Sequence, residues 1–203
     1  MALTLRKNYL LALVALNILL LPSLYIWGHP NFLYALFRPA PGTPLPVYGE
    51  MPFFGMLTQD GQSFGNPQMK GKYWVADFIF TRCQNQCPMM STKFRALQTV
   101  LPADVGLASF SVDPEHDTPD VLKSYAGQYN AREAKWFFLT GSKEAIEQVV
   151  DALHLGRSDD PGMHSLRFVL LDKQLRVRGY YDSEDTESLG KMKADIESLR
   201  RER

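Results

Sequence analysis

Cysteine is scarce in this sequence, because only two of its 203 residues are cysteine, and only four are histidine. Two cysteines cannot build the disulfide framework that holds many small secreted domains together. Residues 51–203 are also numerous enough to bury a hydrophobic core without covalent cross-links. The two cysteines therefore have either a role other than a framework or no role at all.

Net charge is absent as well, since 22 Lys and Arg residues balance 22 Asp and Glu residues. Residues 51–203 contain 19 basic and 21 acidic residues, so this part carries a small negative charge. A chain without excess positive charge has no general attraction to a phosphate backbone, which argues against a nucleic-acid partner. Internal repeats and low-complexity tracts are also missing. The length is that of one domain with an appendage.

A long hydrophobic run is present at the N-terminus. Arg6 and Lys7 precede an apolar stretch over residues 9–27, which is close to the length that spans the hydrocarbon core of a bilayer. Basic residues before the run, and none directly after it, predict that residues 1–8 are cytoplasmic and the remainder lies outside. A cleaved signal peptide is the alternative interpretation. The bulky residues 24–27 disfavour it, because a signal peptidase requires small side chains.

Residues 28–50 contain a dense series of prolines. Proline at this density prevents a helix or a central strand, so this segment is predicted to be a stiff, extended spacer. The spacer would connect a transmembrane anchor at 9–27 to a soluble domain at 51–203.

Beyond residue 50 the sequence alternates between strand-like and helix-like patterns. The run YWVADFIF at 73–80 is typical of a buried strand, and apolar residues follow at helical spacing over 90–101. Thr118 and Pro119 have the residue types of a helix N-cap and a first helical position. Further strands are expected at 105–112 and 136–139, hairpins at 53–64 and 166–181, and helices at 146–153 and 189–199. This order predicts an α/β domain with a central mixed sheet flanked by helices.

Three chemistry-bearing segments are predicted to meet at one edge of that sheet. Reactive groups in such folds gather beyond the carboxyl ends of the parallel strands. Cys83 follows the strand at 73–80, and Asp113 follows the strand at 105–112. His164 precedes the strand at 166–171, and it joins them if this last strand runs antiparallel.

The two cysteines are separated by three residues and lie where a helix begins. The positive end of a helix dipole lowers the pKa of nearby thiols. Cys83 and Cys87 are also close enough to form either a disulfide or two bonds to one metal ion. A purely structural disulfide is the alternative, but closing so short a loop would stabilise the domain little. The spacing favours a functional pair.

A site of two thiolates and one imidazole suits copper better than zinc. Structural zinc normally takes four protein ligands, and the chain has no third cysteine. Thiolates select Cu(I), whereas an imidazole also accommodates Cu(II). We therefore take Cys83, Cys87 and His164 as the candidate ligands, although spacing alone indicates only that such a site can form.

The remaining polar candidates have more ordinary interpretations. His116 lies among solvated residue types, and His154 lies at a helix end, where a cation favours the dipole. Asp113 and Asp117 either tune copper or orient a partner, or they form a turn and favour the next helix N-terminus. The sequence leaves both alternatives open.

These motifs together resemble the SCO/SenC family of membrane-anchored copper chaperones, which have a thioredoxin-like fold. The resemblance extends from about Pro52 to the C-terminus and rests on four segments in order. They are FIFTRCQNQCP at 78–88, SVDPEHDTP at 111–119, FLTG at 138–141, and HS at 164–165 before a strand that ends in Asp172. The resemblance implies that Cys83, Cys87 and His164 bind copper, and that Asp113 and Asp117 belong to the acidic loop of the family.

The resemblance also implies a partner, because the copper of this family is used to assemble the binuclear copper centre of cytochrome c oxidase. The partner would be its copper-bearing subunit or another copper or thiol protein. One alternative is a membrane-tethered thiol–disulfide reductase, in which Cys83 attacks and Cys87 resolves; another is a redox or copper sensor. His164 separates the first two, because metal binding needs the imidazole and dithiol exchange does not. Whether the protein is an enzyme stays open at this point.

A short anchor without an Arg- and Ser-rich transit segment favours a bacterial inner membrane, with the domain in the periplasm. The alternative is a mitochondrial inner membrane, with the domain in the intermembrane space.

Overall fold

The computed structural model describes residues 44–153 and 166–202. These residues belong to one compact unit that begins at Pro44. In this part of the chain, no helix is both long and apolar enough to cross a membrane. The anchor predicted at residues 9–27 lies outside the described residues.

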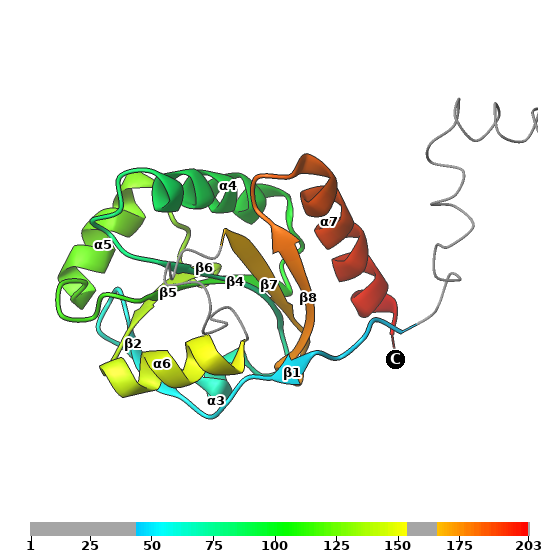
Figure 1. The fold of residues 1–203 in the computed structure, drawn as a ribbon, viewed down its shortest axis with the longest axis horizontal. Helices are drawn as coiled ribbons and strands as arrows, with labels where there is room; N and C mark the ends of the chain where they lie inside the picture. Colours follow the sequence, from blue (N-terminus) through cyan, green and yellow to red (C-terminus); the bar gives the residue numbers. More distant parts are fainter. Residues whose placement is uncertain (1–43, 154–165, 203) are drawn as a thin grey trace, which may run out of the picture. The chain divides into compact units, whose positions relative to one another are not determined.

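The centre of the unit is a mixed sheet with the strand order β1-β8-β7-β4-β5-β6-β2-β3 (Figure 1). Strand β4 pairs in parallel with β5, and β5 pairs in parallel with β6, whereas β7 runs antiparallel to β4. The strand bounds are β1 Gly49–Glu50, β2 Gly55–Thr58, β3 Ser63–Gly65, β4 Tyr73–Ile79, β5 Val105–Ser111, β6 Trp136–Thr140, β7 Arg167–Leu171 and β8 Arg176–Asp182.

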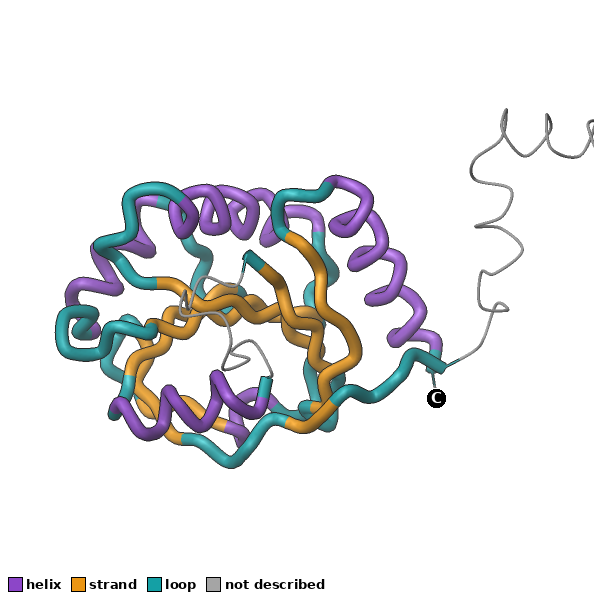
Figure 2. Tube along the Cα trace, in the orientation of Figure 1, coloured by secondary structure: helices purple, strands orange, loops and turns teal. Residues whose placement is uncertain are grey.

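Helices cover both faces of the sheet (Figure 2). The larger helices on one face are α4 (Gln86–Val100), α5 (Pro119–Gln128) and α7 (Thr186–Arg201), and the other face carries α3 (Asn66–Met69) and α6 (Lys143–Ala152). Each face has its own hydrophobic core.

Alternation along β4 explains the two cores, because successive side chains of a strand point to opposite faces. Val75 and Ile79 belong to the core under α4, and Trp74 and Phe78 belong to the core that includes α6. All seven residues of β4 are buried, as the apolar run predicts.

The predicted fold class, an α/β domain with a mixed sheet flanked by helices, is confirmed. Both predicted hairpins are present, as β2–β3 and β7–β8. Helix α5 begins as expected, with the Thr118 hydroxyl accepting a hydrogen bond from the Val121 N–H at 3.5 Å. Strand β1 and helix α3 are additions that the sequence patterns did not predict, because each covers only about one period and therefore repeats no pattern.

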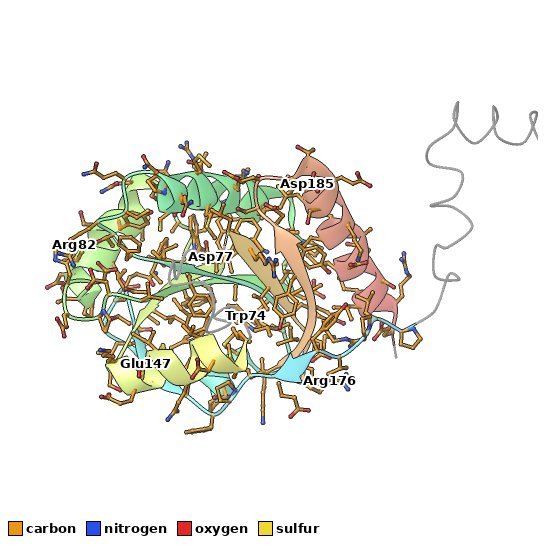
Figure 3. The ribbon with its side chains drawn as sticks, in the orientation of Figure 1. Trp74, Asp77, Arg82, Glu147, Arg176 and Asp185 are labelled. Carbon is orange, nitrogen blue, oxygen red and sulfur yellow. The ribbon has the colours of Figure 1, made fainter. Side chains whose placement is uncertain are left out.

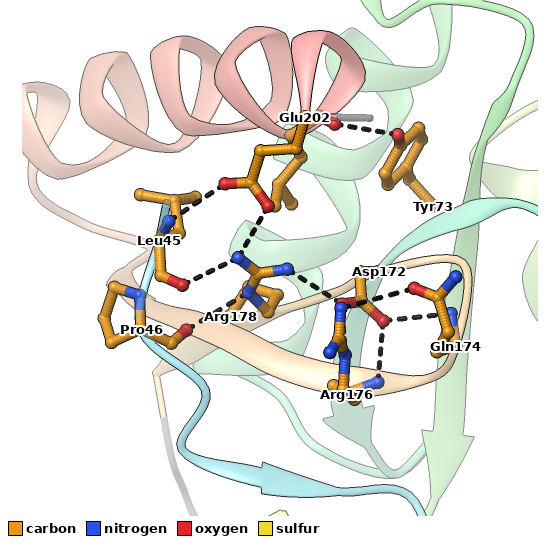
Figure 4. A network of polar contacts seen from close by, with 9 residues as sticks. Leu45, Pro46, Tyr73, Asp172, Gln174, Arg176, Arg178 and Glu202 are labelled. Atoms are coloured by element: carbon orange, nitrogen blue, oxygen red, sulfur yellow. Dashed lines mark hydrogen bonds and ion pairs between the residues drawn. The ribbon is translucent and has the colours of Figure 1, made fainter. Parts of the chain in front are cut away.

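A buried arginine ties the two ends of the unit together (Figure 4). The Arg178 guanidinium, which is 3% exposed, donates to Asp172 Oδ2 at 2.9 Å and to Glu202 Oε2 at 2.8 Å. It also donates to the backbone carbonyls of Leu45 at 2.7 Å and Pro46 at 3.2 Å. Residues that directly precede β1 are therefore packed on the domain. We call these five residues the Arg178 clamp.

We expect Arg178→Met to lower the free energy of unfolding by about 3–5 kcal/mol, because it removes the buried cation that pairs with Asp172 and Glu202 and donates to two backbone carbonyls. Urea unfolding followed by tryptophan fluorescence measures this loss. Arg200→Ala is the matched control: Arg200 is 36% exposed and pairs with Asp104 at the surface, so its loss should cost less than about 1 kcal/mol. Equal losses in the two variants would contradict a stabilising role for the clamp.

Candidate dithiol site

The chain brings three loops to the edge where the parallel strands end. The turn after β4 contains Cys83, the loop after β5 contains the acidic segment 113–117, and a short turn after β6 leads into α6. Because β7 is antiparallel to β4, its first residues lie at this same edge. Leu166, just before β7, packs against the same core as Cys83.

Helix α4 positions the two cysteines. Cys83 precedes the helix and Cys87 lies in its first turn, and the two thiols are free. The backbone N–H of Cys87 donates to the Cys83 sulfur at 3.4 Å, and the N–H of Cys83 donates to the Phe80 carbonyl at 3.1 Å. Cys83 is partly exposed, whereas Cys87 is only 3% exposed. One sulfur is thus accessible and the other is covered.

The two thiols differ in acidity for physical reasons. Burial tends to raise the pKa of Cys83, but the N–H groups of Cys87, Asn85 and Gln86 and the Cys87 thiol outweigh it and lower this pKa below its ordinary value. Burial raises the pKa of Cys87 to about 12, and the nearby Cys83 and Asp77 add to the shift. Cys83 is therefore the more reactive nucleophile of the pair.

Asp117 connects the dithiol turn to the loop after β5. Its carboxylate is fully buried and accepts hydrogen bonds from the Thr81 N–H at 3.1 Å, from the Thr81 hydroxyl, and from the Ser111 hydroxyl at 2.6 Å. Thr81 is two residues before Cys83. These contacts give Asp117 a role that neither of the two sequence alternatives described, because they join the dithiol turn to the loop after β5.

Asp113 makes a more exposed connection between the same two segments. Its carboxylate accepts from Arg82 Nη2 at 2.6 Å and from Nε at 3.0 Å, and the Arg82 side chain is 63% exposed (Figure 3). Exposed ion pairs contribute little to stability. Arg82 instead gives the rim beside Cys83 an accessible positive charge, whose partner Asp113 is 21% exposed.

We expect Asp117→Asn to cost about 2 kcal/mol of unfolding free energy, because an amide cannot satisfy all three buried donors. The loosened turn should also slow alkylation of Cys83 by iodoacetamide several-fold at neutral pH. Asp113→Asn, which weakens an ion pair with the exposed Arg82, should alter both quantities little. If iodoacetamide alkylates Cys83 in Asp117→Asn at the wild-type rate, Asp117 does not position the dithiol.

Asp77 is a buried carboxyl group that the sequence analysis did not single out. It lies in β4 on the face under α4, is 0% exposed, and neither of its oxygens has a hydrogen-bond partner in the described residues (Figure 3). Burial raises its pKa to about 7, although the Ser109 hydroxyl and its own backbone N–H lower it in part. The signal was present in the sequence, as the one ionisable carboxyl within the apolar run YWVADFIF.

The raised pKa of Asp77 makes stability depend on pH. Between about pH 4 and pH 7 the unfolded chain releases this proton while the folded chain keeps it, so stability falls as the pH rises. Asp77→Asn removes this titration. We expect the free energy of unfolding of the variant, relative to that of the wild type, to rise by roughly 3 kcal/mol between pH 4 and pH 8. Urea unfolding at both pH values measures the gain, and a difference independent of pH would refute it.

The third candidate ligand, His164, lies outside the described residues, as does His154. Within the described residues, no three His, Cys, Asp or Glu side chains form a group able to hold a metal ion. His116 is exposed in the acidic loop, as its neighbours predicted. The described residues thus contain two of the three candidate ligands, Cys83 and Cys87.

An apolar groove of about 630 Å³ lies beside the acidic loop. It is lined by the β2–β3 hairpin, by Pro114, Thr118 and Pro119, and by the turn after β6. Neither cysteine lines it, so the groove is separate from the dithiol.

Comparison with known proteins gives consistent matches. The family model described as SCO1/SenC matches residues 48–200. The chain is 32% identical over 162 residues to the SCO1 protein homolog of Bacillus subtilis. The aligned region covers 75% of this chain and 84% of that protein.

Solved structures agree in fold. The structure of BsSco, described as a member of the Sco family of cytochrome c oxidase assembly proteins with a disulfide switch, matches with a TM-score of 0.67 and 31% identity. The matched region covers 79% of this chain and the whole of the BsSco chain. ScoI of Arabidopsis thaliana with copper bound matches with a TM-score of 0.60 and 24% identity, over 72% of this chain and 98% of that one.

Proposed function

The chain belongs to the SCO1/SenC family, has its thioredoxin-like fold, and we propose that it is a copper chaperone. In this proposal Cys83, Cys87 and His164 bind one copper ion as cargo. The observation that carries it is the pair of free thiols at the start of α4, one of them accessible and with a lowered pKa. Thiolates are the form in which cysteine binds metals.

The donor set fits copper chemically. Two thiolates favour Cu(I), and an added imidazole accommodates Cu(II) as well. Support for His164 as the third ligand comes from topology: it lies two residues before Leu166, which packs on the core that Cys83 also contacts. The copper-bound Arabidopsis relative shares the fold.

The proposed recipient is the copper-bearing subunit of cytochrome c oxidase, or another copper or thiol protein. BsSco is described as belonging to a family of cytochrome c oxidase assembly proteins. Cys83 is exposed enough to exchange copper with ligands of a recipient, and the exposed Arg82, held by the partly buried Asp113, provides a charge beside it for docking. We further propose that residues 9–27 anchor the chain in a bacterial inner membrane, with the domain on the periplasmic side.

A second candidate function is a thiol–disulfide reductase that keeps the copper-accepting cysteines of a partner reduced. The contrast between an accessible, acidic Cys83 and a covered Cys87 favours this candidate, because it suits one attacking and one resolving thiol. The disulfide switch described for BsSco is in line with it.

Copper titration tests the chaperone. The reduced full-length chain, kept in detergent without oxygen, is titrated with Cu(I) and with Cu(II). We expect one copper per chain, no tight binding in Cys83→Ser, and an affinity at least about tenfold weaker in His164→Ala, as for other metal-site changes. His116→Ala is the matched control and should bind like the wild type.

Wild-type affinity in His164→Ala would overturn the proposed ligand set. Weak copper binding by the wild type, together with intact disulfide exchange, would overturn the chaperone and leave the reductase as the function.

A further inference from the structure

Exposed charges are divided unevenly between the two ends of the sheet, which Arg82 and Arg176 mark in Figure 3. At the dithiol end, the loop after β5 exposes Glu115. The loop after β8 reaches the same end, because β8 runs antiparallel to β7, and it exposes Glu184 and Asp185. At the opposite end most of the exposed charges are positive. The domain is therefore polarised along its strands, although it has little net charge.

Five exposed cations gather at the end opposite the dithiol, and we call them the basic edge: Lys70, Lys72, Arg132, Lys173 and Arg201. Lys70 and Lys72 precede β4, and Lys173 lies in the turn between β7 and β8. Arg132 lies in the loop before β6, and Arg201 is the last residue of α7. Within the described residues, none of the five has a carboxylate at ion-pair distance. Their charge is therefore not neutralised by the domain itself.

Direct contacts bring these segments together. The Gly71 N–H donates to the Lys173 carbonyl at 3.0 Å, so the turn before β4 adjoins the β7–β8 turn. The Lys173 ammonium lies 5.0 Å from the centre of the Tyr73 ring. The Tyr73 hydroxyl in turn donates to the Leu199 carbonyl at 3.0 Å, near the end of α7. These three segments therefore form one continuous surface.

Lys135 connects Arg132 to the same surface. Burial lowers the pKa of Lys135, and the charge of Asp104 raises it in part. The positive charges of Arg132 and Lys72 lower this pKa further. Arg132 and Lys72 therefore both lie within electrostatic range of Lys135, and the loop before β6 belongs to the basic edge.

Most carboxylates at this end already pair with other arginines. Asp172 and Glu202, for example, both pair with Arg178. In the part of the chain that the structure describes, Glu50 and Glu133 are the exposed carboxylates at this end without an ion pair. Five unpaired cations against two unpaired carboxylates leave an excess of positive charge.

The position where the described chain begins indicates what this edge faces. The Leu45 N–H donates to Glu202 Oε1 at 2.9 Å, so the first residues of the domain lie beside the end of α7. Sixteen residues, 28–43, lie between the proposed anchor at 9–27 and the domain. A chain of that length can span at most about 50 Å, at about 3.1 Å per residue in the extended form of proline-rich linkers. Such a tether holds the basic edge nearer to a bilayer than the dithiol end.

We propose that the basic edge binds the anionic headgroups of the membrane in which the chain is anchored. Each Lys or Arg close to an anionic bilayer strengthens binding by about fivefold. The same surface repels the acidic dithiol end. Together the two effects turn the dithiol away from the bilayer, where a soluble domain of a recipient can reach Cys83. The inference rests on the membrane anchor of the proposed function and does not depend on copper binding.

Lysine acylation in nanodiscs tests this orientation. The full-length chain is inserted into nanodiscs of phosphatidylcholine alone, or of phosphatidylglycerol and phosphatidylcholine in equal parts, and is treated briefly with an N-hydroxysuccinimide ester. We expect the anionic lipid to slow acylation of Lys70, Lys72 and Lys173 by about fivefold. Lys143, which is 71% exposed at the dithiol end, should change by less than about twofold. Raising the salt from about 0.1 M to about 1 M should remove the difference, because the Debye length shortens from about 10 Å to about 3 Å.

Charge reversal elsewhere on the basic edge keeps the three lysines as reporters. Arg132→Glu combined with Arg201→Glu leaves three unpaired cations against four carboxylates. In the anionic nanodiscs, this variant should therefore be acylated as fast as in phosphatidylcholine alone. Lys143→Glu combined with Arg167→Glu is the matched control, because it reverses two exposed cations at the dithiol end. The control should keep the slow acylation of the wild type.

Equal acylation of the three reporter lysines in the two lipids would overturn the proposal, and rates that are equally slow in both would indicate a protein contact instead. Slowing of Lys143 to the same extent would also overturn it, because the domain would then have no preferred orientation. Slow acylation that persists in the Arg132→Glu, Arg201→Glu variant would contradict a role for the basic edge.

Failure of the proposed anchor gives a different result. A chain that does not enter nanodiscs would refute the anchor, and sedimentation with vesicles of the same anionic composition then tests the basic edge by itself. The wild type should sediment with these vesicles, and the Arg132→Glu, Arg201→Glu variant should stay in solution. A wild type that stays in solution would overturn the proposal.

Discussion

The parallel pairing of β4 with β5 is the constraint on which the rest of the structure depends. Seven consecutive residue pairs hold the two strands in register, and both strands are completely buried. This pairing brings the ends of both strands to one edge, where Asp117 bonds the dithiol turn. It also puts Asp77 beside Ser109 inside the core. The reactivity of the thiols therefore depends on a backbone arrangement several residues away.

Much of this architecture could be predicted because it follows from patterns longer than one structural period. The apolar run of β4, the amphipathic face of α4 and the Thr118 N-cap each identify an element from neighbouring residues alone. The dithiol was equally visible, since its spacing and its place before a helix are local properties. The shared edge followed from strand direction, which the antiparallel pairing of β7 with β4 bears out.

What could not be predicted depends on contacts between distant segments. Strand β1 is two residues long, and it forms because β8 provides a partner far along the chain. The sequence places Asp77 in a strand but does not show what surrounds its side chain. Only the packing of α4 over β4 shows that the Asp77 carboxyl is buried near the Cys87 thiol. The hydrogen bonds between Thr81 and Asp117 likewise join residues that are 36 positions apart. A pattern in one segment does not contain such information.

The Arg178 clamp also determines how the domain can be connected to other proteins. The Leu45 N–H donates to Glu202 Oε1 at 2.9 Å, so the first and last parts of the unit meet at one corner. That corner adjoins the end of β7 and the start of β4, which is the sheet edge opposite the dithiol. Neighbouring ends make a domain suitable for insertion or circular permutation. Either end of the unit can therefore be joined to another protein at the corner of the sheet that lies opposite the dithiol.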